Sequence, residues 1–146
     1  MNQRAKSYAL VAIQLICIGI IAVAGPVLPR NIFSHVLLIA GALLGFWAIM
    51  VMELGRFNIT PDIHKNSRMI TKGPYKFIRH PMYTSVLMIT LAWVLNSPTI
   101  LRSVIWIALL VDLISKLKYE EKLLTNRYQE YLDYQKRTKG LIPFIF

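Results

Sequence analysis

Two long apolar segments at the start of the chain constrain its fold more than any other feature. Residues 7–29 carry no charged side chain, and residues 32–54 carry one, Glu53, near their end. A helix needs about 20 apolar residues to cross the hydrocarbon core of a bilayer, and each segment is that long. The first segment is longer than the apolar core of a usual signal peptide, so we expect it to be retained. The chain is therefore predicted to be an integral membrane protein.

The composition agrees with a membrane protein. Hydrophobic residues make up 55% of the 146 residues and charged residues 16%, whereas about 25% of residues are charged in soluble domains. The net charge of +10 could indicate nucleic acid, but the basic residues lie beside the apolar segments, where they would face anionic lipid head groups. We therefore expect contacts with membrane lipids and none with nucleic acid. Cys17 is the only cysteine, and the pattern predicts neither a disulfide nor a metal site.

Two further apolar segments predict two more helices. Residues 83–96 are short for a span, but the helix can begin at Pro81, since proline suits the first helical position. Residues 99–117 form the fourth segment. Beyond it, one continuous helix is predicted over residues 118–139, outside the membrane, with Gly140 as its stop signal. We predict an all-α integral membrane protein with about four transmembrane helices.

The distribution of Lys and Arg predicts the topology. Two basic residues precede the first span, one lies in the first connection, six lie in the polar segment 55–82, and seven follow from Lys116 onward. Basic residues gather on the cytosolic side, so both termini and the polar segment are expected there. We divide the chain into two N-terminal spans, 1–54, and a second region, 55–146, whose polar loop and C-terminal helix lie on the same side of the membrane and can form one site. The small size favours a bacterial inner membrane.

Within the apolar segments, a few small and ionisable residues predict how the helices meet. Gly41 and Gly45 are four residues apart, which permits close approach of another helix, and we expect the first span in that place. Asp112 is an ionisable residue inside the fourth segment and is a functional candidate for that reason. The alternative is a structural partner for it, either Arg102 or Lys116.

The polar stretch TKGPYKFIRHPMYTS, residues 71–85, carries the candidate chemistry. If a helix begins at Pro81, the backbone amides of Met82, Tyr83 and Thr84 lack partners within it and point out along the positive end of its dipole. An anion site is predicted at this helix start.

Side chains on either side of this helix start add charge of both signs. Arg79 is a permanently charged bidentate donor, and His80 can donate or accept a hydrogen bond. The acidic pair Glu120 and Glu121 follows the fourth segment on the same side of the membrane. A zwitterion with a sulfonium charge and ribose hydroxyls would match these groups. A membrane anchor whose basic loop binds anionic lipid would have much the same composition.

Four motifs in order resemble the isoprenylcysteine carboxyl methyltransferase family. They are GPYKFIRHPMY, then, after an apolar hairpin, EEKLL, RYQEYLDYQKRT and LIPF, and the resemblance covers roughly residues 53–146. The related phospholipid N-methyltransferases share the general plan. Ser85 departs from the pattern, because the family usually has glycine two residues after the tyrosine of RHPxY.

The resemblance implies a membrane-embedded methyltransferase that uses S-adenosylmethionine and a lipophilic acceptor entering from the bilayer. It makes residues 55–146 the catalytic region, in which the loop and the C-terminal helix form the cofactor site. Arg79 and Glu121 are the expected catalytic residues. Arg79 would orient a carboxylate of the substrate or the cofactor, and either Glu121 or His80 would serve an amine as base. The implied reaction is protein-S-isoprenylcysteine O-methylation. Phospholipid or small-lipid N-methylation, a sterol-reductase-like activity and a non-enzymatic scaffold that binds anionic lipid are the alternatives. The expected cofactor-binding residues are Tyr75, Arg79, His80, Pro81, Tyr83, Glu120 and Glu121.

Overall fold

The structure, a computed structural model, describes residues 3–52 and 69–142. This part of the chain is all-helical, as predicted, apart from one isolated β-bridge between Ile78 and Lys139. Glu53, much of the predicted polar segment and the last four residues of the chain lie outside the described residues. The elements are α1 (Gln3–Val23), α2 (Ile32–Met52), the 3₁₀ helix η1 (Gly73–Lys76), α3 (Pro81–Asn96), α4 (Ile100–Arg127) and α5 (Tyr131–Arg137).

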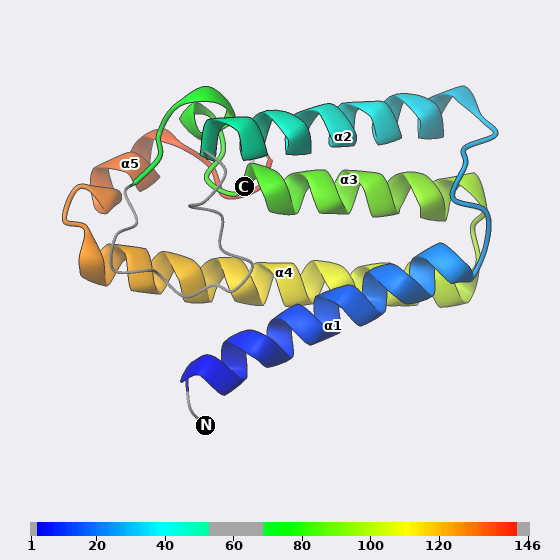
Figure 1. Ribbon diagram of the computed structural model, residues 1–146, viewed down its shortest axis with the longest axis horizontal. Coiled ribbons are helices and arrows are strands. Elements are labelled where there is room, and N and C mark those ends of the chain that lie inside the picture. Colours follow the sequence, from blue (N-terminus) through cyan, green and yellow to red (C-terminus); the bar gives the residue numbers. More distant parts are fainter. Residues whose placement is uncertain (1–2, 53–68, 143–146) are drawn as a thin grey trace.

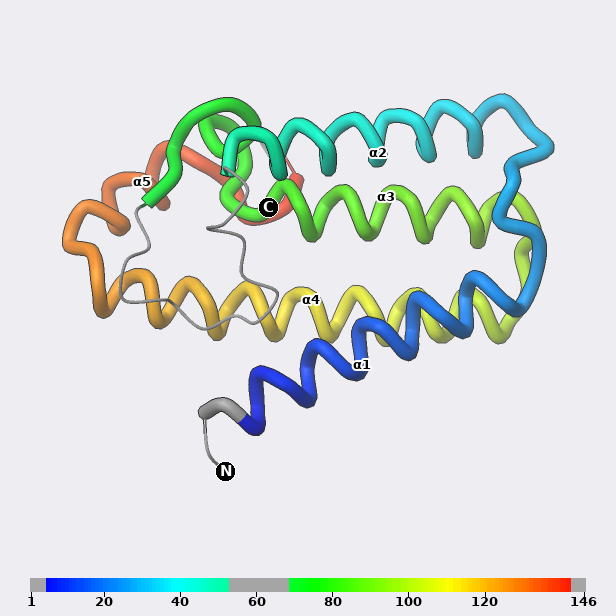
Figure 2. Tube along the Cα trace, in the orientation of Figure 1, coloured from blue at the N-terminus to red at the C-terminus, as the bar shows by residue number. Residues whose placement is uncertain are grey.

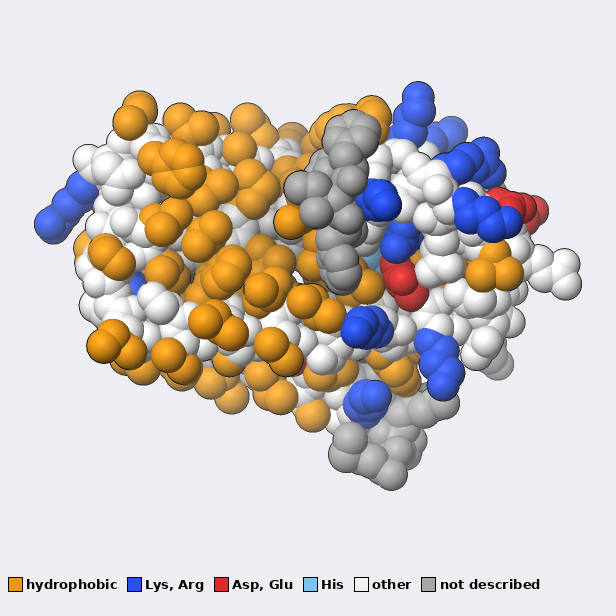
Figure 3. Space-filling view, turned by 180° about the vertical axis from the view of Figure 1, so that it is seen from behind, with side chains coloured by type: hydrophobic (Ala, Val, Ile, Leu, Met, Phe, Trp, Pro, Cys, Tyr) orange, Lys and Arg blue, Asp and Glu red, His pale blue; other side chains and the backbone are white. Residues whose placement is uncertain are grey.

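Apolar side chains cover the flanks of the helical bundle, and Lys and Arg side chains gather mainly at one end (Figure 3). Two stretches, Ala5–Val23 and Ile32–Met52, are long and apolar enough to cross a membrane. The helix α3 is also apolar but has 16 residues. Side chains such as Ile32 and Ile100 are at least 80% exposed. A continuous exposed apolar surface of this kind is typical of a face that meets lipid.

The helices pack in pairs, with α2 along α3 and α1 along α4 (Figure 1). The prediction that Gly41 and Gly45 face the first span is therefore wrong. A Cβ added at Gly41 would lie 3.0 Å from the Cβ of Met88, and one at Gly45 would lie 2.4 Å from the Ser85 hydroxyl. Ser85 donates a hydrogen bond to the carbonyl of Gly41 at 2.7 Å. Serine at this position therefore joins α3 to α2.

The connections α1–α2 and α3–α4 meet at one end of the bundle (Figure 2). There the fully buried Arg102 donates to the carbonyls of Trp93 at 2.7 Å, Ser97 at 3.3 Å and Pro26 at 3.5 Å. A Cβ at Gly25 would lie 2.8 Å from the guanidinium carbon, so a larger residue in the α1–α2 connection would displace the end of the Arg102 side chain. Arg102 binds backbone here and is not the predicted partner of Asp112.

Asn96 reinforces the same end of the bundle. Its amide nitrogen donates to the carbonyls of Pro26 at 3.2 Å and Leu28 at 3.0 Å, and its side-chain oxygen accepts from the backbone N–H of Arg30 at 2.7 Å. The three bonds join the end of α3 to backbone groups of the α1–α2 connection. The last residue of α3 therefore fixes the path of the α1–α2 connection.

The C-terminal helix is broken, in contrast to the predicted continuous helix over residues 118–139. Helix α4 ends at Arg127, Tyr128 is extended, and α5 begins at Tyr131. The break turns the chain so that the side chains of Tyr131 and Tyr134 become buried. The Tyr134 hydroxyl donates to the carbonyl of Tyr75 in η1 at 2.5 Å. A straight helix over residues 118–139 could not make this contact, so the chain breaks after Arg127.

Candidate functional site

Backbone hydrogen bonds from the C-terminal segment, residues 138–142, hold the RHP segment, residues 79–81, in place. The N–H of Arg79 donates to the carbonyl of Lys139 at 2.8 Å, and the N–H of His80 donates to that of Gly140 at 3.0 Å. In return, the N–H of Lys139 donates to the carbonyl of Phe77 at 3.3 Å. The two segments lie far apart in the sequence and next to each other in the fold. The position of Arg79 and His80 therefore depends on the end of the chain.

The predicted anion site at the start of α3 is not formed as expected. His80 is the residue before the helix, and its carbonyl accepts the N–H groups of Tyr83 at 3.0 Å and Thr84 at 3.2 Å. Two of the three amides assigned to an anion are therefore already bonded within the chain. The prediction that α3 begins at Pro81 is confirmed, but the amides do not form the expected cradle.

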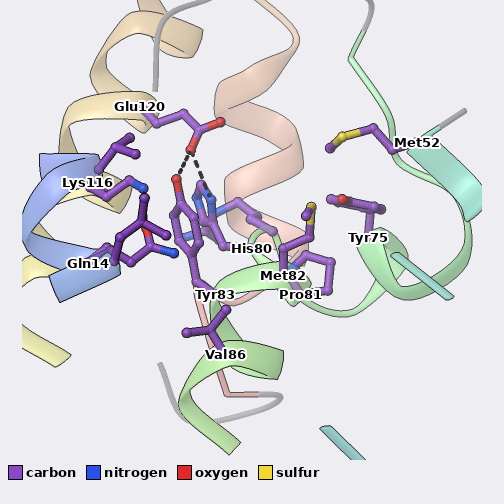
Figure 4. A pocket seen from close by; sticks show the side chains of 13 residues that line it. Gln14, Met52, Tyr75, His80, Pro81, Met82, Tyr83, Val86, Lys116 and Glu120 are labelled. Carbon is purple, nitrogen blue, oxygen red and sulfur yellow. Dashed lines mark hydrogen bonds and ion pairs between the residues drawn. The ribbon is translucent and has the colours of Figure 1, made fainter. Parts of the chain in front are cut away.

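Side chains rather than amides form the polar centre, and His80 lies between the two glutamates. Its Nδ1 is 3.5 Å from Oε2 of Glu120, and its Nε2 is 3.3 Å from Oε1 of Glu121. Tyr83 donates its hydroxyl to Oε2 of Glu120 at 2.9 Å and stacks on the imidazole, with ring centroids 5.3 Å apart (Figure 4). Only a doubly protonated imidazole could donate to both carboxylates.

Arg79 and Glu121 form a second layer of this centre. The Nε of Arg79 donates to Oε1 of Glu121 at 2.6 Å, and its Nη1 donates to the carbonyls of Thr138 and, at 3.3 Å, Gln135. Gln135 also donates to Oε2 of Glu121 at 3.0 Å. Burial favours the neutral acid, but hydrogen bonds from His80 and Arg79 outweigh it and lower the pKa of Glu121 below its ordinary value. Glu121, on α4, thus connects that helix to the RHP segment through Arg79 and His80 and to α5 through Gln135.

A cavity of about 220 Å³ opens between α1, α3 and α4 beside this centre. Six of the seven predicted cofactor residues line it, whereas Glu121 is not among its lining residues. The side chain of Glu120 keeps twice the exposure of Glu121, 31% against 15%. The six lining residues are Tyr75, Arg79, His80, Pro81, Tyr83 and Glu120. The structure therefore brings the predicted residues together and separates the two glutamates into a cavity-facing and an inward-facing one.

Two polar residues of this cavity were not predicted as site residues. Lys116 lines it and is only 2% exposed, and its Nζ donates to Oε1 of Gln14 from α1 at 2.5 Å. Lys116 was considered only as a partner for Asp112. Its spacing four residues after Asp112 and four before Glu120 was the available signal, since residues at this spacing share one helix face. Gln14 lies in an apolar segment and carries no motif that could have marked it.

Unpaired polar atoms near the cavity fit the polar groups of S-adenosylmethionine. The buried hydroxyls of Tyr75 and Tyr131 have no hydrogen-bond partner among the described residues. Burial raises the pKa of Tyr75 well above its ordinary value, so its hydroxyl stays protonated and can donate. Glu120 offers a carboxylate to an ammonium or to ribose hydroxyls. The cavity of about 220 Å³ is smaller than the roughly 300–1,000 Å³ usual for whole ligands.

Comparison with known proteins adds independent findings. The model of the phospholipid methyltransferase family matches residues 29–131. The cobalt-zinc-cadmium resistance protein CzcN of Cupriavidus metallidurans is 25% identical over 103 residues, which are 68% of this chain and 48% of that protein. The chain thus spans about half the length of this curated relative. No solved structure matches. Within residues 3–52 and 69–142, no group of three or more His, Cys, Asp or Glu side chains could hold a metal ion.

Proposed function

The chain belongs to the phospholipid methyltransferase family, and on this basis we propose that it transfers a methyl group from S-adenosylmethionine to a lipophilic acceptor. The family indicates a membrane methyltransferase. One observation carries the finer proposal: a single cavity holds His80, Glu120 and Tyr83 on its polar side and apolar side chains such as Val11 and Val86 elsewhere. Such a cavity suits a polar cofactor that meets an apolar acceptor.

We further propose that α1–α4 cross a bacterial inner membrane four times, with both termini in the cytosol. The basic residues before α1, in the segment 55–82 and after Lys116 support this orientation. In this orientation the cavity would lie at the cytosolic end, where a soluble cofactor can reach it. The acceptor would then enter sideways from the bilayer.

Within the cavity, we propose Tyr75, His80, Pro81, Tyr83 and Glu120 as the residues that contact the cofactor. When bound, the cofactor supplies a methyl group on a sulfonium sulfur for in-line displacement, in which positioning provides much of the rate. Arg79 lines the cavity and could orient a carboxylate. Glu121, expected from the sequence to be catalytic, is better described as a positioning residue, because it contacts Arg79 and His80 behind the cavity.

The acceptor could be an isoprenylcysteine carboxylate or the amine of a phospholipid or other small lipid. The motif order supports the first, and the family match supports the second. A carboxylate is already ionised at neutral pH and needs no base. An amine must lose a proton, and His80 and Glu120 are the cavity groups that could take it.

Transfer of a labelled methyl group tests the proposal. Membranes that contain the full chain would be incubated with methyl-tritiated S-adenosylmethionine and either an isoprenylcysteine analogue or phosphatidylethanolamine, followed by extraction into organic solvent. We expect wild type to label one of the two lipids and Glu120→Gln to lower the rate roughly tenfold to hundredfold, the effect of losing one charged hydrogen bond. Lys118→Met, at an exposed position of α4, is the matched control.

No label in either lipid with wild type would contradict methyl transfer to these acceptors. Binding of anionic vesicles without any labelling would favour the scaffold instead.

A further inference from the structure

A buried cation occupies the side of the cavity formed by α1 and α4. The Nζ of Lys116 donates to Oε1 of Gln14 at 2.5 Å and lies 5.3 Å from the centroid of the Tyr83 ring. Figure 4 shows the amino group of Lys116 beside Gln14 and the ring, apart from Tyr75 and Met52 on the other side of the cavity. Lys116 therefore forms a polar group within the cavity that is separate from the contacts of Arg79.

The ammonium of Lys116 has unused hydrogen-bonding capacity. It carries three N–H donors, and its hydrogen-bond acceptor in the part of the chain that the structure describes is Gln14. Asp112 and Glu120, one turn away on either side, act on it through space, but no ion pair within 4 Å joins them to it among the described residues. Glu120 is instead engaged by Tyr83 and His80. A buried ammonium without a close counter-ion is costly.

The surroundings of Lys116 indicate which ligand would supply that counter-ion. Val11 and Leu15 from α1, the helix that carries Gln14, and Val86 from α3 also line the cavity. An anionic head group attached to an apolar chain would meet both the cation and these side chains. A carboxylate or phosphate here would also be attracted to a sulfonium held at the His80 side.

We propose that Lys116, held by Gln14, is the subsite for the anionic head group of the lipophilic methyl acceptor. The inference rests on the proposed methyl transfer and adds that the acceptor is an anionic amphiphile. Gln14 lies outside the residues 29–131 matched by the family, so this half of the subsite is contributed by a helix that the family match does not include.

A matched pair of probes tests the subsite. Oleate and oleyl alcohol share one apolar chain and differ in the head group. Binding of each would be measured on the detergent-solubilised full chain at mildly alkaline pH. We expect wild type to prefer oleate, and Lys116→Met to weaken oleate binding roughly tenfold to hundredfold while leaving oleyl alcohol unchanged, since a charged hydrogen bond is lost. Lys116→Arg should keep the preference, and Lys118→Met should match wild type.

Unchanged binding of oleyl alcohol also reports that the Lys116→Met protein is folded. The proposal is overturned if wild type shows no preference for oleate, or if Lys116→Met keeps it.

Binding of S-adenosylmethionine, measured on the same proteins, separates this inference from the proposed function. If Lys116→Met weakens binding of the cofactor and leaves binding of oleate unchanged, the anion at Lys116 is the carboxylate of the cofactor. The assignment of Lys116 to the acceptor is then wrong. If wild type fails to bind the cofactor, methyl transfer fails, while the preference for oleate still decides whether Lys116 is an anion subsite.

Discussion

Each end of the helical bundle holds an arginine, fully buried Arg102 at one end and half-buried Arg79 at the other, and the two arginines are used differently. Arg102 gives its hydrogen bonds to backbone carbonyls in the connections and lines none of the cavities described above. Arg79 binds a carboxylate and the carbonyls of the C-terminal segment, and it also lines the cavity. The first end is closed by its own backbone. The second end has charged groups left over for a ligand, which is why we assign function there.

Removal of Arg102 should have the largest effect on stability. Arg102→Ala removes three hydrogen bonds to backbone carbonyls and creates a cavity, so we expect a loss of roughly 3–5 kcal/mol in the free energy of unfolding. Thermal denaturation in detergent would measure it. Arg30→Ala, an exposed arginine at the same end, is the control and should change little. An equal effect of both variants would mean that the buried bonds of Arg102 do not hold the connections.

Replacement of Glu121 should cost more stability than replacement of its neighbour Glu120. Glu121→Ala removes the partner of Arg79, and the side chains of the pair are 13% and 15% exposed. We expect a loss of roughly 2–3 kcal/mol, less than for a fully enclosed pair because some solvent remains. Glu120→Ala should cost much less stability, since Glu120 faces the cavity. If thermal denaturation shows the reverse order, the inward and cavity-facing roles are exchanged.

The α2–α3 contact lies between the two ends and should affect stability alone. Gly45→Ala would force the new methyl group against Ser85 and its bond to Gly41. We expect a loss of about 1–3 kcal/mol, as for other overpacked sites. Gly19→Ala is the matched control, because nothing lies within 4 Å of a Cβ there. A Gly45→Ala protein as stable as Gly19→Ala would contradict the close helix approach.

Acid should remove the stabilisation that the ionised Glu121 side chain provides, a smaller effect than those of the substitutions above. The pKa of Glu121 is lowered in the folded state from an ordinary value of 4.5. Its ionisation therefore adds stability above that value, and this contribution is lost as the pH falls through the lower folded pKa. The difference in denaturation midpoint between wild type and Glu121→Gln should shrink as the pH falls below 4.5. A difference that stays constant in that range would show that the charge of Glu121 does not stabilise the fold.

Local signals made part of this molecule predictable. Pro81 marks the start of α3, and the apolar segments mark four of the helices, because these features depend on nearby residues. The break after Arg127 was not predicted, since it depends on burial of Tyr131 and Tyr134 against a distant segment. The pairing of α2 with α3 likewise depends on Ser85, a residue that the resemblance had marked only as a departure.

The candidate site likewise has parts that the sequence predicted and parts that depend on contacts between distant residues. The motifs around His80 and Glu120 predicted a shared site, and the fold brings these side chains within 3.5 Å of each other. The expected amide cradle was wrong because the His80 carbonyl takes two of its donors. Lys116 and Gln14 were missed because their contact joins α4 to an apolar segment 102 residues away. The i,i+4 spacing of Lys116 with Asp112 and Glu120 is a local signal, whereas the long-range contact with Gln14 leaves none.

Titration of S-adenosylmethionine into the purified protein tests the central claim most directly. Wild type and Arg30→Ala should bind with the same affinity, since Arg30 lies at the closed end of the bundle. Glu120→Gln, which changes the cavity-facing carboxylate, should weaken binding roughly tenfold to hundredfold. Absence of binding to wild type, or equal binding by wild type and Glu120→Gln, would contradict a cofactor site at the His80–Glu120 end.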